Sequence, residues 1–318
     1  MPFGLGGTGW LGVGFETTYG TWITPTVWLP IRSESLQKVE DKIYRTNIRG
    51  VADRTGAIQG YYHIEGDVEF EVNADVLLYF LYAGRFAPVK SGAGPYVYTF
   101  TPTHIASPTT ATGPGTPKSL SVTVSRDARF FGYTGVNVGR YSFRVEDGLM
   151  LCTVSLIGLE ETNQAGPFTP VYNTTTPFGP LYNSIEIPTA TVRTDIDTFT
   201  LDIDDGGEAQ NRIKTTGGRA AAFMKWGERE VTLSMEHDFD ALTDYNTFLN
   251  QTVQSITFKG SVGASNEVSF VVAATVVDSY EVGLSSLGDL TRATVQYHGY
   301  YGATDVVTIV DKSVISIL

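Results

Sequence analysis

The sequence has a single cysteine, Cys152, among its 318 residues. An intramolecular disulfide is therefore excluded, and stability must come from packing or assembly. Cys152 lies in the apolar run 149–157, so we expect it to act as a small buried side chain. No apolar run approaches the roughly 20 residues that a membrane-spanning helix needs. The N-terminus lacks a basic segment and a long apolar run, so the sequence predicts a soluble protein without a secretion signal.

Basic residues are also scarce. Lysine and arginine number 22 against 34 aspartates and glutamates, which gives a net charge of -12. This balance argues against a protein that grips nucleic acid by neutralising phosphates, because that requires clustered Lys and Arg. It is compatible with a wall that keeps DNA from adhering as the duplex slides past. The four histidines, His63, His104, His237 and His298, are too scattered to form a zinc site.

Motifs of catalysis are missing as well. Neither a G-x-S-x-G elbow nor a Walker A sequence occurs. Residues 4–9 satisfy G-x-G-x-x-G, but no strand can precede them at the N-terminus, so we interpret them as a glycine-rich arm. Asp202 and Asp204 resemble the start of a calcium loop whose later ligands do not follow. Glu69 and Glu71 could imitate a glycosidase pair, yet they project from one face of one strand. We expect neither an enzyme nor a cofactor.

Thr, Val, Tyr, Phe and Gly are abundant, and this mixture favours strands joined by glycine turns. Residues 68–72 alternate apolar and acidic side chains with the period of a half-buried strand. Asn73 then offers an N-cap for a helix over residues 74–83, and Gly84 offers its end. The sequence predicts a mainly β protein with one short helix after this strand.

The same pattern recurs later in the chain. Residues 231–235 alternate, and Asp238 or Asp240 could cap a helix over residues 241–250. The segment 148–158 resembles 289–299, and the strands upstream of these segments also match. We therefore predict a duplication, with two unrelated β units as the alternative. The predicted buried stripe of the second helix consists of Leu242, Tyr245, Phe248 and Leu249.

Composition suggests the boundaries of two domains. Residues 164–190 are rich in proline and separate the two matched units, which is typical of a semi-rigid linker. We predict an N-terminal arm over 1–30, one domain over 31–163, the linker over 164–190, and a second domain over 191–318 that ends in a strand or arm. The excess length of the first half is assigned to a Thr-, Pro- and Gly-rich surface loop over 102–118.

The N-terminal arm carries aromatic rings with few polar spacers. These rings pack either on their own domain or against a neighbouring subunit. The candidate subunit-contact residues are Trp10, Phe15, Tyr19, Trp22 and Trp28.

Several motifs together resemble the tail tube proteins of long-tailed, siphovirus-type bacteriophages. They are the opening Glu16-Thr17-Thr18-Tyr19-Gly20-Thr21, the segment Leu29-Pro30-Ile31-Arg32-Ser33-Glu34-Ser35-Leu36, the turn-rich stretch 45–60, and the strand and helix over 68–83. Residues 96–102 and 133–136 extend the likeness through the first half. The second half follows through the internal repeat.

The resemblance implies two tandem tail-tube-like β-sandwich or barrel domains, each flanked by a short helix. Members of the family form rings of six similar domains, so a duplicated chain implies a trimeric ring, with a hexamer as the other possibility. Segments 38–60 and 204–218 match loops that reach the next ring. The candidate inter-ring residues are Lys38, Asp41, Lys42, Arg45, Arg49, Arg54, Asp204, Asp205, Glu208, Arg212 and Lys214. The candidate acidic lumen face is Glu69, Glu71, Asp195, Asp197 and Asp202.

The function implied is a conduit in the virion tail, made in the host cytoplasm, through which double-stranded DNA passes without specific binding. Its partners would be further copies of the chain and the tail terminator, tape measure and baseplate or tip proteins, with no membrane partner. One alternative is a carbohydrate-binding or adhesin-like tail component that uses exposed tryptophans, Trp226 among them, as a sugar platform. The other is a hydrolase on a β scaffold, which would need a pocket with convergent acids or histidines.

Overall fold

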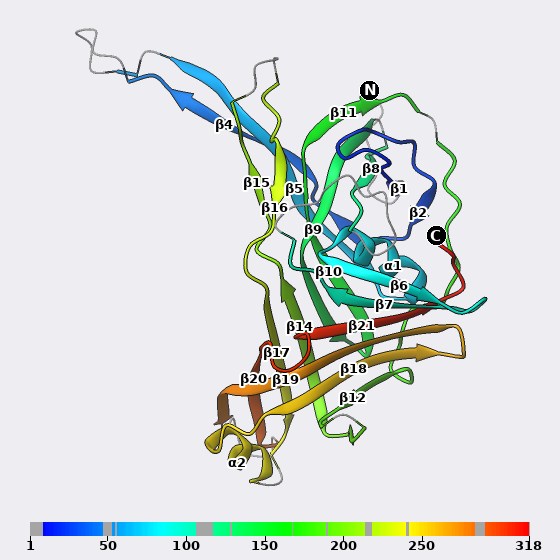
Figure 1. Ribbon diagram of the computed structural model, residues 1–318, viewed down its shortest axis with the longest axis vertical. Coiled ribbons are helices and arrows are strands. Elements are labelled where there is room, and N and C mark those ends of the chain that lie inside the picture. The colour runs from blue at the N-terminus through cyan, green and yellow to red at the C-terminus, as the bar shows by residue number, and fades with distance from the viewer. Residues whose placement is uncertain are drawn as a thin grey trace.

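The structure is a computed structural model that describes residues 9–46, 53–54, 56–105, 117–127, 129–166, 168–188, 190–213, 218–239, 242–283 and 290–317. Strands dominate these residues, and two short helices accompany them (Figure 1). The predicted mainly-β class is confirmed. Most of the predicted surface loop over 102–118 lies outside the described residues.

One antiparallel sheet, which we call the main sheet, runs through both halves of the chain. Its edge is formed by β3 (Ser33–Glu34) and β4 (Gln37–Tyr44), which pair along β5 (Ala57–Glu71). The order then continues with β10 (Leu149–Gly158), β9 (Phe130–Glu146), β14 (Ile196–Asp204), β17 (Glu230–Asp238), β20 (Arg292–Gly299) and β19 (Asn266–Gly283).

Two further sheets pack beside the main sheet. The first flanking sheet consists of β2 (Val27–Leu29), β1 (Trp10–Phe15), β8 (Leu120–Ser125), the first part of β9, and β11 (Glu160–Gln164). The second consists of β13 (Val192–Arg193), β12 (Asn183–Glu186), β18 (Gln254–Val262), the first part of β19, β21 (Val307–Ser313), β7 (Tyr96–Pro102) and β6 (Phe86–Ser91). A small separate ladder joins β15 (Glu208–Gln210) to β16 (Phe223–Lys225).

The strand order is repeated between the halves. In the first half β10 lies between β5 and β9, and in the second half β20 lies between β17 and β19. The pairing of β10 with β9 shifts register after Ser155, and the pairing of β20 with β19 shifts between Val277 and Ser279. Bulges are specific local features of a strand pair. The duplication stays a prediction, and this correspondence supports it.

The repeated pairing also fixes which residues correspond. Gly158 lies opposite Ile64 in the first half, and Gly299 lies opposite Val231 in the second. Ile64 therefore corresponds to Val231, and Val68 corresponds to Met235. The alignment of the two strands by their alternation alone, which matched Val68 to Val231, is four residues out of register. Alternation has a period of two, so it cannot distinguish shifts by an even number of residues.

The two halves share their sheets. Strand β9 of the first half pairs with β14 of the second, and β7 of the first half pairs with β21 of the second. The proline-rich segment also packs inward, because Phe178 is fully buried and its backbone N–H donates to Val72 O at 2.9 Å. The domain boundaries stay a prediction, but the connection between the halves is a continuous sheet as well as the segment 164–190.

Helix α1 (Ala74–Ala83) begins and ends where the sequence predicts. The side chain of Asn73 accepts a hydrogen bond from Val76 N at 2.9 Å, and Gly84 follows the last turn. A Cβ atom at position 84 would lie 1.9 Å from the Tyr141 hydroxyl, so a glycine is required there by space. Every residue of α1 is buried.

Helix α2 (Thr243–Leu249) differs from the expectation. Leu242 occupies the N-cap position without a side-chain hydrogen bond, Asp238 ends β17, and Asp240 lies outside the described residues. No residue of α2 is buried, and Leu242 and Leu249 are 60% and 58% exposed. Phe248 is half-buried and packs against the core, so the predicted buried stripe is wrong for Leu242, Tyr245 and Leu249.

Candidate assembly surfaces

The two halves meet in the main sheet through a pair of antiparallel strands. In this pairing of β9 with β14, Arg144 lies opposite Thr200 and Arg140 lies opposite Asp204. The Arg140 Nη2 atom is 3.2 Å from Asp202 Oδ1, which adds an exposed ion pair across the junction. The junction is thus a strand-pairing interface between two units with the same strand order.

Each end of the main sheet carries a strand that is paired on one side. Strands β3 and β4 pair only with β5 among the described residues. At the other end, the last residues of β19, Glu281 to Gly283, pair with β20 and are exposed. Unpaired sheet edges present backbone donors and acceptors that can bind another strand.

The face of the main sheet that points away from the core is polar. Glu69, Glu71 and Asp202 of the predicted lumen face lie on it, as the alternating burial of β5 and β14 shows. Glu69 Oε2 lies 2.8 Å from Arg144 Nη2, so part of the negative charge is paired. The acidic side chains on this face outnumber the arginines: Glu65, Asp67, Glu69, Glu71, Asp202, Asp204, Glu230, Glu236 and Glu281 against Arg32, Arg140, Arg144 and Arg292.

The other two lumen candidates are placed differently. Asp197 Oδ2 lies 2.7 Å from Arg292 Nη1 at the margin of the polar face. Asp195 belongs instead to a cluster beside α2, where Arg193 donates hydrogen bonds to both of its oxygens and His237 Nδ1 lies 3.6 Å away. The hydrogen bonds from Arg193 lower the pKa of Asp195. His237 is 3% exposed, so this cluster faces the interior more than a surface.

The predicted inter-ring segments lie side by side. Strands β4 and β5 form a long hairpin, which we call the β4–β5 arm. It projects from the molecule next to β15 and β16 (Figure 1). Tyr62 N donates to Arg219 O at 2.9 Å, and Ala221 N donates to Tyr62 O at 2.8 Å. Arg219 also forms an ion pair with Glu40. The two segments that the sequence assigned to equivalent loops are therefore joined just beyond their ends, at Tyr62 and at Arg219 to Ala221.

Individual inter-ring candidates fall into three groups. Lys38, Asp41 and Lys42 lie on β4, and Arg45 and Arg54 lie beyond it on the β4–β5 arm. Asp204 ends β14, Glu208 lies on β15, and the Arg212 guanidinium lies 4.7 Å from the Phe223 ring centroid. Arg49 and Lys214 lie outside the described residues.

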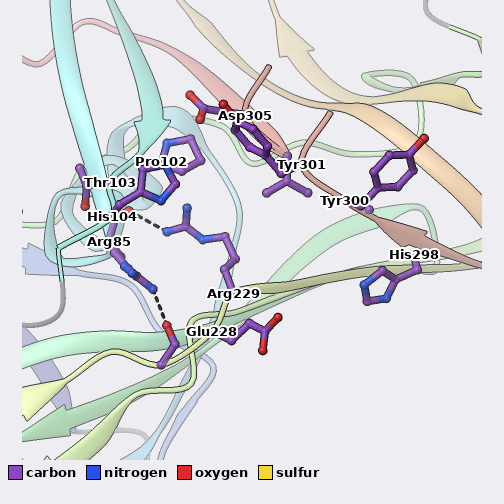
Figure 2. Close-up of a pocket in the computed structure, with 13 residues that line it drawn as sticks. Arg85, Pro102, Thr103, His104, Glu228, Arg229, His298, Tyr300, Tyr301 and Asp305 are labelled. Atoms are coloured by element: carbon purple, nitrogen blue, oxygen red, sulfur yellow. Dashed lines mark hydrogen bonds between the residues drawn. The ribbon is translucent and has the colours of Figure 1, made fainter. Parts of the chain in front are cut away.

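Asp205 differs from the other candidates, because it is a buried residue of the connection between β14 and β15. It is fully buried, and its Oδ1 lies 2.6 Å from Arg229 Nε. Burial raises the pKa of Asp205, and Arg229 opposes that shift. Figure 2 shows the neighbouring pocket, where Arg229 Nη2 donates to Arg85 O and Arg85 Nη1 donates to Gly227 O, each at 2.7 Å. Asp205 thus anchors the root of the 204–218 segment.

The aromatic residues of the N-terminal arm pack within their own chain. Trp10 and Trp28 are each 8% exposed, and their ring centroids lie 4.6 Å apart. Phe15 stacks on Tyr79 of α1 with centroids 5.7 Å apart. The Tyr19 hydroxyl accepts a hydrogen bond from Met224 N at 3.1 Å. Trp22 is partly exposed. Trp10 and Trp28 are therefore left out of any proposed subunit contact.

The tryptophans also bear on the sugar-platform alternative. Trp226 is 2% exposed, and its indole N–H donates to Val138 O at 3.4 Å. Together with Trp10 and Trp28, it offers no open ring face to a sugar. Within the described ranges there is no group of three or more potential metal ligands and no helix long and apolar enough to cross a membrane.

A comparison with protein families matches residues 8–299 to a family described as phage tail tube protein. The match covers both halves and, among the described strands, all but β21. The chain belongs to the phage tail tube protein family. No curated protein matches the sequence. Membership makes this tail tube protein a structural component of the virion tail, in a family that is generally non-enzymatic.

Sequence reasoning missed two buried features of this tail tube protein. Asp205 looked like one more acid of a polar loop, although Arg229, its partner, lies 24 residues away. Glu16 entered the sequence analysis only through the opening motif, yet it is 4% exposed and accepts hydrogen bonds from Ser119, Ser121, Gly20 N and Gly135 N. Burial raises the pKa of Glu16, and these hydrogen bonds oppose the shift. No local pattern signals such partners.

Proposed function

We propose that three copies of this chain close into a ring by strand pairing and that the rings stack into the tail tube. The observation that carries the proposal is the junction between β9 and β14, where one unit extends the sheet of the next. The same contact between copies would join the end of β19 to β3 and β4 of the next chain. A heterologous, head-to-tail contact of this kind generates a closed ring when the rotation between neighbouring copies adds up to one full turn.

The internal junction predicts the register of that contact. Arg144 corresponds to Gly283 through the repeated pairing with β10 and β20. Thr200 corresponds to Ser35, because both strands pair in the same order with β17 and β5. Since Arg144 lies opposite Thr200, Gly283 would lie opposite Ser35 of the next copy. By the same count, Glu281 would lie opposite Gln37.

The number of copies follows from the family and the repeat. The resemblance implies rings of six similar domains, which family members commonly form, and each chain offers two units with the same strand order. Three copies would then supply six positions, with six copies of a single unit as the competing count. Closing the main sheet on itself would also remove its unpaired edges.

We assign the polar face of the main sheet to the lumen. Its acids outnumber its arginines, and the chain carries a net charge of -12. A wall of this sign repels phosphates within about a Debye length of roughly 10 Å at 0.1 M salt. Double-stranded DNA would pass from capsid to host without specific binding.

The β4–β5 arm and the adjoining 204–218 segment would contact the next ring. They project together from one end of the molecule (Figure 1), which is the geometry that an axial contact requires. The tail terminator, the tape measure protein and the baseplate or tip proteins are the further partners that this role needs. Synthesis in the host cytoplasm before assembly fits the single buried cysteine.

A cysteine pair tests the ring directly. We expect the variant Gln37→Cys/Glu281→Cys to form covalent dimers and trimers on oxidation, because directly opposite residues on paired strands have Cβ atoms about 4.5–5.5 Å apart. Electron microscopy of the same preparation at high protein concentration should show hollow filaments. Cys152 is fully buried and needs no replacement.

The matched control is Ser142→Cys/Asp202→Cys, the corresponding pair inside one chain. It should cross-link within the monomer at any concentration. If the internal pair cross-links while Gln37→Cys/Glu281→Cys stays monomeric under conditions that give filaments, the proposed register is wrong. If neither filaments nor cross-linked oligomers form at any concentration, the ring itself is refuted.

A further inference from the structure

The outer face of α2 is apolar and uncovered. Leu242, Tyr245 and Leu249 are 60%, 38% and 58% exposed and lie at helical spacing on one side of α2. Val282, on the neighbouring end of β19, is 43% exposed. Contiguous exposed apolar side chains of this kind mark interaction surfaces.

The corresponding face of α1 is fully covered. Since Ile64 corresponds to Val231, the residues of α1 that match Leu242, Tyr245 and Leu249 are Asp75, Leu78 and Tyr82. All three are buried. The covering elements belong to the second flanking sheet, as Figure 1 shows for β21 and β7 beside α1 in the middle of the molecule, whereas α2 lies at one end.

Named contacts hold this cover over α1. The Ser313 hydroxyl on β21 donates a hydrogen bond to Asp75. The ring of Tyr82 lies 5.3 Å from that of Phe100 on β7, centroid to centroid. On the main sheet beside α1, Phe143 lies 4.3 Å from Phe270 of β19, again between centroids. The cover over α1 thus combines β7 of its own half with β21 of the second half.

We propose that the outer face of α2 is covered by the first flanking sheet of a second copy of this chain. Strand β11 holds the place in that sheet that β21 holds in the second flanking sheet, since each pairs with the first part of the long strand, β9 or β19. Phe131 on β9 corresponds to Phe270 and is partly buried in one chain. It would cover Val282, which corresponds to Phe143.

This inference rests on the proposed ring, and it adds a second layer to the contact. The strand pairing would join the main sheets of two copies, while α2 would seat under the neighbour's flanking sheet. An apolar anchor next to a line of backbone hydrogen bonds is the usual anatomy of a stable interface. It also explains why α2 buries no residue within its own chain.

The test compares Leu249→Lys with Asn250→Lys. Both positions are exposed and adjacent at the helix C-terminus, where a cation is acceptable, so the thermal unfolding of the dissociated chain should not change. We expect Leu249→Lys to raise the protein concentration needed for filaments by about tenfold or more, the effect of losing one interface anchor. Asn250→Lys should assemble like the parent.

The outcomes separate the two proposals. If Leu249→Lys assembles like the parent while Gln37→Cys/Glu281→Cys still cross-links between copies, the cover of α2 is refuted and the ring stands. Equal impairment by Asn250→Lys would also overturn the cover, because the effect would then come from the added charge. If Gln37→Cys/Glu281→Cys does not cross-link between copies and the parent forms no filaments, the ring fails first.

A separate observation concerns the free edge at β3 and β4. The Leu36 N–H donates to Glu34 Oε2 at 3.0 Å, and Leu36 O accepts from Arg126 Nη2 and from the Tyr133 hydroxyl. Arg126 Nε in turn lies 2.9 Å from Glu34 Oε1. These two charged side chains therefore occupy the backbone groups through which the edge would pair.

Among the described residues, the corresponding strand inside the chain, β14, has no charged side chains over its backbone groups in this way. Leu36 corresponds to Leu201, which lies opposite Phe143 in the β9–β14 junction. Glu34 corresponds to Phe199 and Arg126 to Gly260, and neither can occupy a backbone group in this way. We infer that the Glu34–Arg126 pair shields the edge in the free chain and must release Leu36 before a second copy pairs. Charged side chains on edge strands prevent premature pairing in other sheets.

Removing the carboxylate of Glu34 should speed the pairing between copies. We expect Glu34→Ala, placed in the Gln37→Cys/Glu281→Cys background, to cross-link between copies at least about threefold faster, because Leu36 N–H is then open to a partner strand. Glu40→Ala is the control, since it removes a carboxylate from the same edge that pairs with Arg219 and leaves Leu36 untouched. A rate for Glu34→Ala at or below that of the parent would overturn the shield.

Discussion

The buried ion pair between Asp205 and Arg229 gives a quantitative test of the junction between the halves. Replacing Arg229 with methionine keeps most of the side-chain volume beside Phe86, whose ring centroid lies 4.9 Å from the guanidinium. It removes the only charged hydrogen-bond partner of Asp205 among the described residues. Asp205 is fully buried, and Arg229 has a side-chain exposure of 9%.

The expected loss is large. Breaking a buried pair by removing one partner costs about 3–5 kcal/mol, because the remaining charge is left desolvated. The second carboxylate oxygen of Asp205 already lacks a hydrogen-bond partner in the described part of the chain, so little compensation is at hand. We therefore expect Arg229→Met to lower the free energy of unfolding by about 3–5 kcal/mol at pH 8, measured by urea denaturation.

The loss should depend on pH. Burial raises the pKa of Asp205 and Arg229 opposes that rise, so Arg229→Met should raise the folded-state pKa further. The folded variant then holds a proton that the unfolded chain releases, and its stability falls as pH rises from about 4 through that pKa. The deficit relative to the parent should shrink as pH is lowered from 8 towards 5.

Two controls complete this test. The double variant Asp205→Asn/Arg229→Met removes both charges and should recover much of the loss, since a neutral pair replaces the stranded carboxylate. A loss below about 1 kcal/mol for Arg229→Met, with no change between pH 5 and pH 8, would refute the reasoning. It would mean that Arg85 or water takes over the role of Arg229.

Two further predictions concern single buried groups. Asp311 is fully buried with neither oxygen hydrogen-bonded among the described residues, and burial raises its pKa well above the usual range, so stability should fall as pH rises above about 4. Asp311→Asn should therefore unfold at a higher temperature than the parent at pH 8 and converge with it near pH 4. Asn73→Ala should lower the free energy of unfolding by about 1 kcal/mol in urea, whereas Asn73→Asp, which retains a capping oxygen, should lose less.

The sequence predicts the elements whose signals are local. The strand at Val68 shows its alternation, and α1 shows both its cap at Asn73 and its end at Gly84, so their positions follow from short-range rules. The repeat in strand order was also visible. Its register was not, because alternation does not distinguish Val231 from Met235 as the partner of Val68.

Features decided by distant partners could not be predicted. Asp205 was predicted to be an inter-ring contact, and nothing near Glu16 indicated its burial, because their partners Arg229 and Ser119 are remote in sequence. The stripe on α2 read as buried, since apolar spacing says that a face needs a partner but not which chain supplies it. The sequence therefore predicted that Leu249 is buried, but it did not indicate that the residues proposed to bury it belong to another chain.

The two helices together give the strongest reason to read the chain as an incomplete assembly unit. The second half contributes β21 to the cover of helix α1 and extends the main sheet through β14. Helix α2 and the end of β19 occupy the corresponding places, where, among the described residues, the outer face of the helix stays exposed and Glu281 to Gly283 pair only with β20. The exposed apolar face and the unpaired edge therefore occur at the same end, as expected if one contact with a further copy covers both. Independent surface irregularities would have no reason to coincide at the positions that the internal junction defines.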